Sequence, residues 1–159
     1  MIDRADRTAI DARHEFTMRA VVESARMVGA GPSGMRMVAA VTTGTVAGER
    51  LNGEISGPGA DWIRVGGDGF GRVDVRLQIR TDDSALIYVT YDGLLEMNAK
   101  VVAAVGDRTL ETGWDDQYFR TAPVFETGAN QYEWLQQSLF VAKGRITTDG
   151  VEFAVSRVE

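Results

Sequence analysis

The side chains best suited to chemistry gather in one stretch, Arg72 to Leu94, which reads RVDVRLQIRTDDSALIYVTYDGL. A carboxylate at Asp74 can act as acid or base, and the guanidinium of Arg76 can hold an oxyanion by forked hydrogen bonds. The phenol of Tyr88 can donate a proton to an oxygenated substrate. We predict a catalytic set of these three side chains together with Arg120.

A second group of side chains is predicted to bind the substrate around this set. It combines aromatic rings that suit a flat ligand with charged and hydroxyl groups that suit an oxygen atom. The predicted binding residues are Trp62, Arg64, Tyr118, Phe125, Glu126 and Trp134. The alternative is structural: the large rings, with Trp114, would pack in a core. In that interpretation Asp74–Arg76 and Arg120–Glu126 would be surface ion pairs that contribute little.

The chain has few residues that are suited to bind a metal or to carry out redox chemistry. It has no cysteine and a single histidine, His14, near the start of the first expected strand. Neither Asp82-Asp83 nor Asp115-Asp116 has the spacing of a calcium loop. The segment 29–34, GAGPSG, matches G-x-G-x-x-G, but a Val- and Thr-rich strand follows it where a dinucleotide fold needs a helix. We therefore expect no metal and no cofactor, and a hairpin loop at 29–34.

The elements that would position the catalytic set are the two strands of a hairpin. From Arg72 to Arg80 polar and apolar residues alternate strictly, the period of a half-buried strand. The run Ala85 to Tyr91 is β-branched and aromatic and predicts the returning strand. A three-residue loop, Thr81 to Asp83, would place Arg76 opposite Tyr88.

That loop also sorts the side chains of the hairpin between its two faces. Val75, Leu77 and Ile79 would share one apolar face with Ala85, Ile87, Val89 and Tyr91. Asp74, Arg76, Gln78, Leu86, Tyr88 and Thr90 would share the other. This polar face is either a solvated sheet surface or the wall of a pocket, and the sequence leaves both possibilities open.

The rest of the chain predicts many short strands. Glycine and proline recur every eight to twelve residues or so from Gly44 onward, a spacing typical of a sandwich or barrel. One helix is predicted at 98–107 and a helical turn from Asn130. The last two strands, 138–147 and 151–158, form a hairpin around Asp149-Gly150. We expect a flexible lead-in at 1–13 and one domain at 14–159.

Composition narrows the class of protein. The 159 residues suffice for one domain with a core of its own, and 44% hydrophobic with 25% charged residues is ordinary for a globular protein. A net charge of −6 without a basic cluster argues against nucleic acid as a partner. No apolar run approaches about 20 residues, and the N-terminus lacks the apolar segment of a signal peptide. We expect no membrane association and a cytoplasmic location.

Several phrases together carry a resemblance to a known family: GPGADWIRV, the hairpin DVRLQIRTDDSALIYVTYDGLL, and YFRTAPVFETGANQYEWL followed by FVAKGR. They resemble the domain-of-unknown-function family DUF3237, also called uncharacterised protein family UPF0311, over about 15–158. The resemblance implies a closed antiparallel β-barrel of lipocalin or allene-oxide-cyclase character, often self-associated, with no agreed function. Ser84 stands where that family usually has glycine, and Gln136 where asparagine is usual.

The resulting expectation is an all-β protein: a closed antiparallel barrel of about nine to ten strands with one or two short helices. Our first functional hypothesis is an isomerase, dehydratase or cyclase that uses carboxylate, arginine and tyrosine groups on an oxygenated aromatic or cyclic substrate. The second is a non-catalytic carrier or sensor of an apolar ligand. The third is a structural assembly barrel filled by its own side chains. We expect a small-molecule ligand and a homodimer as partners.

Overall fold

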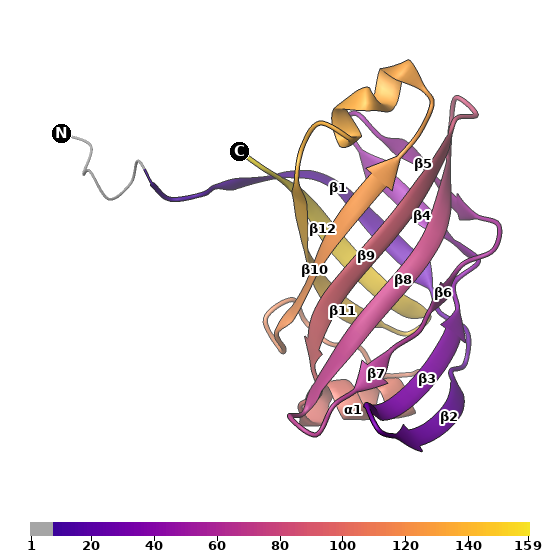
Figure 1. The fold of residues 1–159 in the computed structure, drawn as a ribbon, viewed down its shortest axis with the longest axis vertical. Coiled ribbons are helices and arrows are strands. Elements are labelled where there is room, and N and C mark those ends of the chain that lie inside the picture. Colours follow the sequence, from indigo (N-terminus) through magenta and orange to yellow (C-terminus); the bar gives the residue numbers. More distant parts are fainter. Residues whose placement is uncertain (1–7) are drawn as a thin grey trace.

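The computed structural model of the protein describes residues 8–159, which form one twelve-stranded sheet and two short helices. Figure 1 shows the sheet curled into a barrel. In chain order the elements are β1 (Ala12–Val21), β2 (Arg26–Gly31), β3 (Gly34–Ala40), β4 (Thr43–Gly48), β5 (Asn52–Ser56), β6 (Ala60–Asp61), β7 (Arg64–Val65), β8 (Phe70–Thr81), β9 (Leu86–Glu96), α1 (Ala99–Gly106), β10 (Phe119–Glu126), the 3-10 helix η1 (Asn130–Leu135), β11 (Phe140–Thr147) and β12 (Gly150–Val158).

Eight antiparallel strands close the barrel. The order β8-β5-β4-β1-β12-β11-β10-β9 returns to its start because β9 also pairs with β8. The predicted closed all-β barrel is confirmed, with eight strands in the ring. The remaining strands form an extension at one end, in which β6 and β7 pair with both β8 and β3, and β3 pairs with β2.

The β8–β9 hairpin turns its apolar face into the barrel. Val75, Ile79 and Ile87 are fully buried, as the odd-loop prediction requires. The predicted pairing is wrong by two positions, because the loop is Asp82–Ser84: Arg80 pairs with Leu86, and Arg76 lies opposite Thr90. Ser84 has a φ of 71°, the left-handed conformation that this loop demands and that glycine adopts without strain.

One half of the lumen is filled with aromatic rings. Phe125 makes edge-to-face contacts with Phe16 and Phe140, at ring-centroid distances of 5.8 and 5.1 Å. The helix η1 covers this end of the barrel, and its Tyr132 hydroxyl donates to Asp83 Oδ1 at 2.7 Å. We call this part, from the ring cluster to η1, the filled half.

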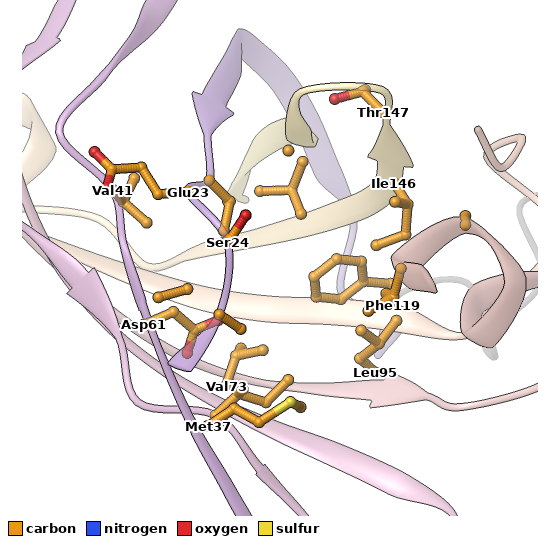
Figure 2. Close-up of a pocket in the computed structure, with 18 of the residues that line it drawn as sticks. Glu23, Ser24, Met37, Val41, Asp61, Val73, Leu95, Phe119, Ile146 and Thr147 are labelled. Carbon is orange, nitrogen blue, oxygen red and sulfur yellow. The ribbon is translucent and has the colours of Figure 1, made fainter. Parts of the chain in front are cut away.

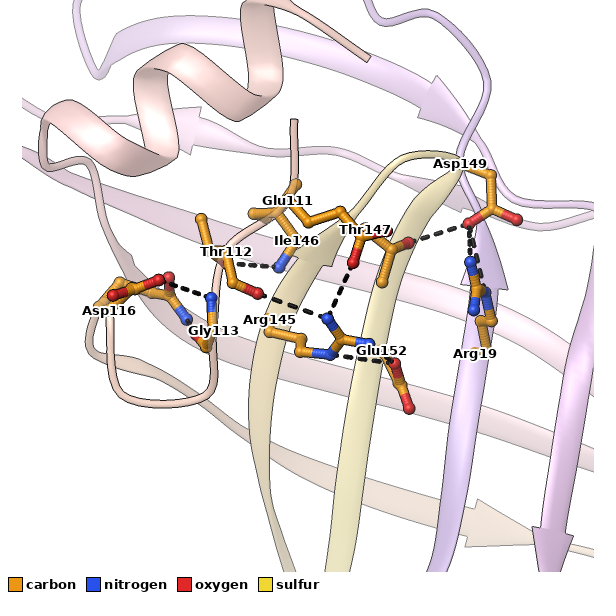
Figure 3. A network of polar contacts seen from close by, with 11 residues as sticks. Arg19, Glu111, Thr112, Gly113, Asp116, Arg145, Ile146, Thr147, Asp149 and Glu152 are labelled. Atoms are coloured by element: carbon orange, nitrogen blue, oxygen red, sulfur yellow. Dashed lines mark hydrogen bonds and ion pairs between the residues drawn. The ribbon is translucent and has the colours of Figure 1, made fainter. Parts of the chain in front are cut away.

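Helix α1 lies across the opposite end of the barrel, as Figure 1 shows. Its N-cap is Asn98, whose side chain accepts a hydrogen bond from Val101 N, and the predicted helix at 98–107 is confirmed. The segment that follows α1 is tied to β11, since Thr112 and Ile146 exchange two hydrogen bonds (Figure 3). Arg145 strengthens this attachment by pairing with Glu111 and Glu152.

Several predicted elements differ in detail from the structure. The alternation of Phe16, Met18, Ala20 and Val22 predicts one strand over 15–28, but the structure interrupts it between β1 and β2. The sequence also predicts a strand over 114–121, which in the structure begins at Phe119. The N-cap of η1 is Ala129, without a side-chain bond, instead of Asn130. The lead-in predicted for 1–13 lies outside the described residues at 1–7, and β1 begins at Ala12. Within 8–159 no helix has the length and apolar character needed to cross a membrane.

Candidate functional site

A cavity of about 320 Å³ occupies the half of the lumen next to α1. Its walls come from the ring strands, from the β2–β3 extension and from α1, and Figure 2 shows side chains from these elements around one space. The walls are mainly apolar, and they include Met37, Ala39, Ile63, Val73, Leu95, Phe119, Ile146 and Phe153. We call this part of the barrel the hollow half.

The hollow half owes its opening to a break in the first long strand. Val22 N still donates to Asp149 O on the β11–β12 turn, but Glu23 N donates to Ala40 O on the other side. The chain therefore leaves β12 after Val22 and follows β3. Exposed Glu23, Ser24 and Arg108 border the resulting mouth, across which the Arg108 guanidinium donates to the carbonyl of Val22.

One carboxylate, Asp61, stands among the apolar walls (Figure 2). It belongs to β6, where its partner across the sheet is Val75, and its Oδ1 accepts a hydrogen bond from Asp74 N at 3.2 Å. Burial raises the pKa of Asp61 to about 7; the Asp74 N–H bond opposes this shift and the Asp74 charge adds to it. Asp61 forms no ion pair with any residue of 8–159.

The second polar group on the wall is the phenol of Tyr91. Its ring is buried and packs edge-to-face on Phe153 at a centroid distance of 5.3 Å. Burial raises the pKa of Tyr91 far above its ordinary value, and the nearby negative charge of Asp61 raises it further. Tyr91 therefore stays protonated at neutral pH. The cavity thus combines a hydrogen-bond donor with a carboxyl group that can be either neutral or ionised.

The predicted catalytic residues lie on the outer surface of the barrel. Asp74 and Arg76 form an ion pair at 3.2 Å whose side chains are about half exposed, and Tyr88 is 39% exposed. Arg120 donates to the carbonyl of Phe119 and lies over the Tyr118 ring at 5.0 Å. The question that the sequence left open is thereby answered: the apolar face of the hairpin lines the lumen, and the polar face lies outside. The roles proposed for these four side chains stay predictions, without the enclosed cavity on which they depended.

The predicted binding residues are scattered. Trp62 and Arg64 line a cleft on the outer surface, whereas Phe125 is buried in the filled half. Trp134 lies beside Phe140 under the guanidinium of Arg50. Tyr118 and Glu126 are exposed on the outside, and no ion pair joins Arg120 to Glu126 within the described residues. The predicted Asp74–Arg76 pair does form.

The sequence prediction missed Asp61 and Tyr91, although both carry a readable signal. In ADWIRV, Asp61 is in phase with Ile63 and Val65, so it is a carboxylate on the apolar face of its strands. Tyr91 is likewise in phase with Val89 on the face predicted to be apolar. A charged or phenolic group on an inward face is more informative than one on a solvated face, because burial must be compensated or used.

The fold and cavity define a class: an antiparallel β-barrel with a cavity at one end of its lumen. The family model for "Protein of unknown function (DUF3237)" matches residues 11–158, and the chain belongs to this family. The UPF0311 protein RPA1785 of Rhodopseudomonas palustris is 29% identical over 153 residues, covering 94% of this chain and 97% of that protein. UPF0311 protein CA_C3321 of Clostridium acetobutylicum is 32% identical over 108 residues, 68% of each chain.

Solved structures agree with the fold. The crystal structure of RPA1785 has a TM-score of 0.85 at 28% identity and covers 95% of this chain and 99% of its own. A more distant structure, described as an enzyme from Penicillium herquei, has a TM-score of 0.70 at 18% identity, with 96% of each chain covered. At that identity the likeness extends to the fold alone.

Proposed function

We propose that this barrel binds a small cyclic, oxygenated molecule in the hollow half and catalyses a proton transfer on it. The observation that carries the proposal is Asp61: a carboxyl group with a pKa of about 7 on a mainly apolar cavity wall. Strongly shifted carboxyl groups in cavities are typical of acid–base sites, because a group that titrates near neutral pH can both give and take a proton.

The size and lining of the cavity support the choice of ligand. About 320 Å³ is near the lower end of the range for small-molecule sites, which suits one compact ring system. Aromatic and aliphatic walls such as Phe119, Leu95 and Val73 favour an apolar ring. Two of the polar groups on the wall, Asp61 and Tyr91, favour an oxygen atom on that ring, and the charge of Asp61 is near enough to Tyr91 to raise its pKa.

The chemistry follows from the two protonation states of Asp61. Neutral Asp61 can donate its proton to a carbonyl, hydroxyl or ether oxygen of the ligand, and ionised Asp61 can accept a proton from an adjacent carbon or hydroxyl group. The Tyr91 hydroxyl can donate a hydrogen bond to the same oxygen and stabilise negative charge that develops there. Isomerisation, dehydration and cyclisation of an oxygenated ring all need these steps.

The test uses hydrogen exchange on compounds that bind. Cyclic enones, lactones and phenols are first screened by thermal shift, and each compound that binds is incubated with the protein in D2O while NMR follows deuterium entering its acidic C–H positions. We expect exchange with the wild type and at least about a hundredfold slower exchange with Asp61→Asn, with binding kept. Asp82→Asn, a carboxylate in the exposed hairpin loop, is the matched control and should exchange at the wild-type rate.

A carrier function is the second candidate, favoured by the dominance of apolar wall over polar groups in the cavity. Under that function the same compounds bind, no exchange occurs, and Asp61→Asn leaves affinity unchanged or improves it. Binding without exchange for every compound would therefore replace the catalytic proposal by the carrier. Failure of all compounds to bind would contradict both.

A further inference from the structure

Basic residues stand opposite one another across adjacent strands on the outer surface. Arg36 of β3 pairs with Arg64 of β7, and Arg64 pairs with Arg72 of β8. The same row continues through Leu94 of β9, which is paired with Arg72, to Arg120 and then Lys143. We call this line of side chains the basic row; its members are Arg36, Arg64, Arg72, Arg120 and Lys143.

This arrangement is unfavourable for folding. Side chains directly opposite in a sheet have Cβ atoms about 4.5–5.5 Å apart, where like charges destabilise the pair. Asp68 neutralises Arg72 by two hydrogen bonds of 2.6 and 3.0 Å, and Arg36 donates to the carbonyl of Trp62. The guanidinium of Arg64, which lies between them, forms no side-chain hydrogen bond or ion pair with any residue of 8–159. The row therefore has a cation without a paired carboxylate, Arg64, between Arg36 and Arg72, in a chain of net charge −6.

The surface is hollowed at this part of the row. A cleft of about 490 Å³ is lined by Arg36, Arg64 and Arg72, by the indole of Trp62, and by Asp74, Asp92 and Leu94. The cleft is separate from the cavity and lies on the other side of the same wall, since Val73 borders both. Three guanidinium groups in a concave site form a geometry suited to an oxyanion, because each presents a planar fork of N–H donors.

The surroundings of the cleft select a compact anion over an extended one. One step along the strands from the row, Asp74 and Asp92 stand opposite each other. These two carboxylates would repel a membrane surface or a nucleic acid strand that covered the face. A single phosphate or carboxylate group is small enough to contact the guanidinium groups without covering the two carboxylates.

We propose that the outer cleft binds a small organic anion through a phosphate or carboxylate group held by Arg36, Arg64 and Arg72, with Trp62 beside the body of the ligand. This site is independent of Asp61 and of the proton-transfer function. It also explains why three arginines are kept in register despite their mutual repulsion. The negative ligand supplies the counter-charge that Arg64 lacks in the protein itself.

The first experiment measures binding of inorganic pyrophosphate and of citrate by calorimetry at constant ionic strength. We expect saturable binding of at least one of these anions, weakened about tenfold to a hundredfold by Arg64→Gln or by Arg36→Gln. Arg80→Gln is the matched control, because Arg80 lies on the same face of β8 outside the cleft. Its affinity should stay within about twofold of the wild type. An equal loss in Arg80→Gln, or no binding of either anion at millimolar concentration, would overturn the proposal.

The second experiment separates a ligand site from a structural role of Arg64. Without anion, Arg64→Gln removes a like-charge contact on both sides, so its Tm should rise by about 1–4 °C. With saturating anion the order of the two Tm values should reverse, because tighter binding stabilises the wild type more than the variant. A lower Tm of Arg64→Gln in both conditions would show that the arginine stabilises the fold instead.

Discussion

The two halves of the lumen belong to one eight-stranded barrel, yet one is packed and the other holds a cavity. In the filled half the rings of Phe16, Phe125 and Phe140 pack edge to face against one another and are buried. In the hollow half the inward positions include smaller groups, such as Ala39 and Gly150, and the chain between β1 and β2 bends away. The contrast shows that one closed barrel can have a packed core at one end of its lumen and a cavity at the other.

The largest expected loss of stability comes from a substitution in the filled half. Phe125→Ala removes a ring with two edge-to-face partners from a packed centre and should lower the free energy of unfolding by about 3–5 kcal/mol. Phe119→Ala is the matched change in the hollow half, where the ring has one such partner and already borders the cavity. Its cost should be smaller, about 1–3 kcal/mol, because fewer contacts are lost. Urea denaturation measures both, and equal losses would remove the distinction between the halves.

The next effect concerns the charge of Asp61 in the hollow half. Its pKa is about 7 in the folded protein and 3.8 ordinarily, so between these values the folded state binds more protons than the unfolded state. Wild-type stability should therefore fall as pH rises from about 4 to 7, by at most about 4 kcal/mol. Asp61→Asn lacks this titration but keeps an oxygen that accepts the hydrogen bond from Asp74 N. The free energy of unfolding of the variant, relative to that of the wild type, should therefore increase as the pH rises from about 4 to 7.

Urea denaturation at pH 4.5, 6 and 8 checks this prediction. A constant difference between Asp61→Asn and the wild type at all three values would show that the carboxyl group has its ordinary pKa. The proton-transfer proposal would then lose its main support. Asp82→Asn again serves as the control, since its carboxylate lies in an exposed loop.

The smallest expected change in stability comes from a substitution in the β8–β9 turn, at the edge of the filled half. Ser84 adopts a φ of 71° in the β8–β9 turn, a conformation that strains any residue with a Cβ. Ser84→Gly should raise the free energy of unfolding by about 0.5–1 kcal/mol, less than the full relief because glycine also gains freedom in the unfolded chain. Thermal unfolding measures this gain as a higher Tm. Compounds that bind in the hollow half should bind the variant as tightly as the wild type, because Ser84 does not line the cavity.

The fold could be predicted from the sequence, because the alternation of polar and apolar residues in 72–80 and 85–91 determines which side chains point inward. Helix α1 was likewise predicted, from the helical spacing of Val101, Val102 and Val105 and from Gly106 near its end. The hairpin register was missed by two positions, since a loop at 82–84 and one at 81–83 give the same alternation. The family resemblance is confirmed by the family model, whereas the homodimer and the cytoplasmic location remain predictions.

The candidate site was harder to predict than the fold. The β8–β9 hairpin has many polar residues, and Asp74 and Arg76 were predicted to be catalytic for that reason. Both lie on the solvent-exposed face of the hairpin. The cavity depends on long-range geometry, namely the break after β1 and the position of α1 across the barrel end. Asp61 sits in a strand of two residues, too short to show a period by itself. Its inward direction becomes plain only when β6 and β7 are placed along β8.

The shortness of β6 has a consequence for insertions and deletions. Asp61 and Trp62 are consecutive, and they point to opposite sides of one wall, into the cavity and into the outer cleft. Removing a single residue between 60 and 65 would shift the alternation by one and exchange the chemistry of the two surfaces. The length of this segment should therefore stay constant across related chains.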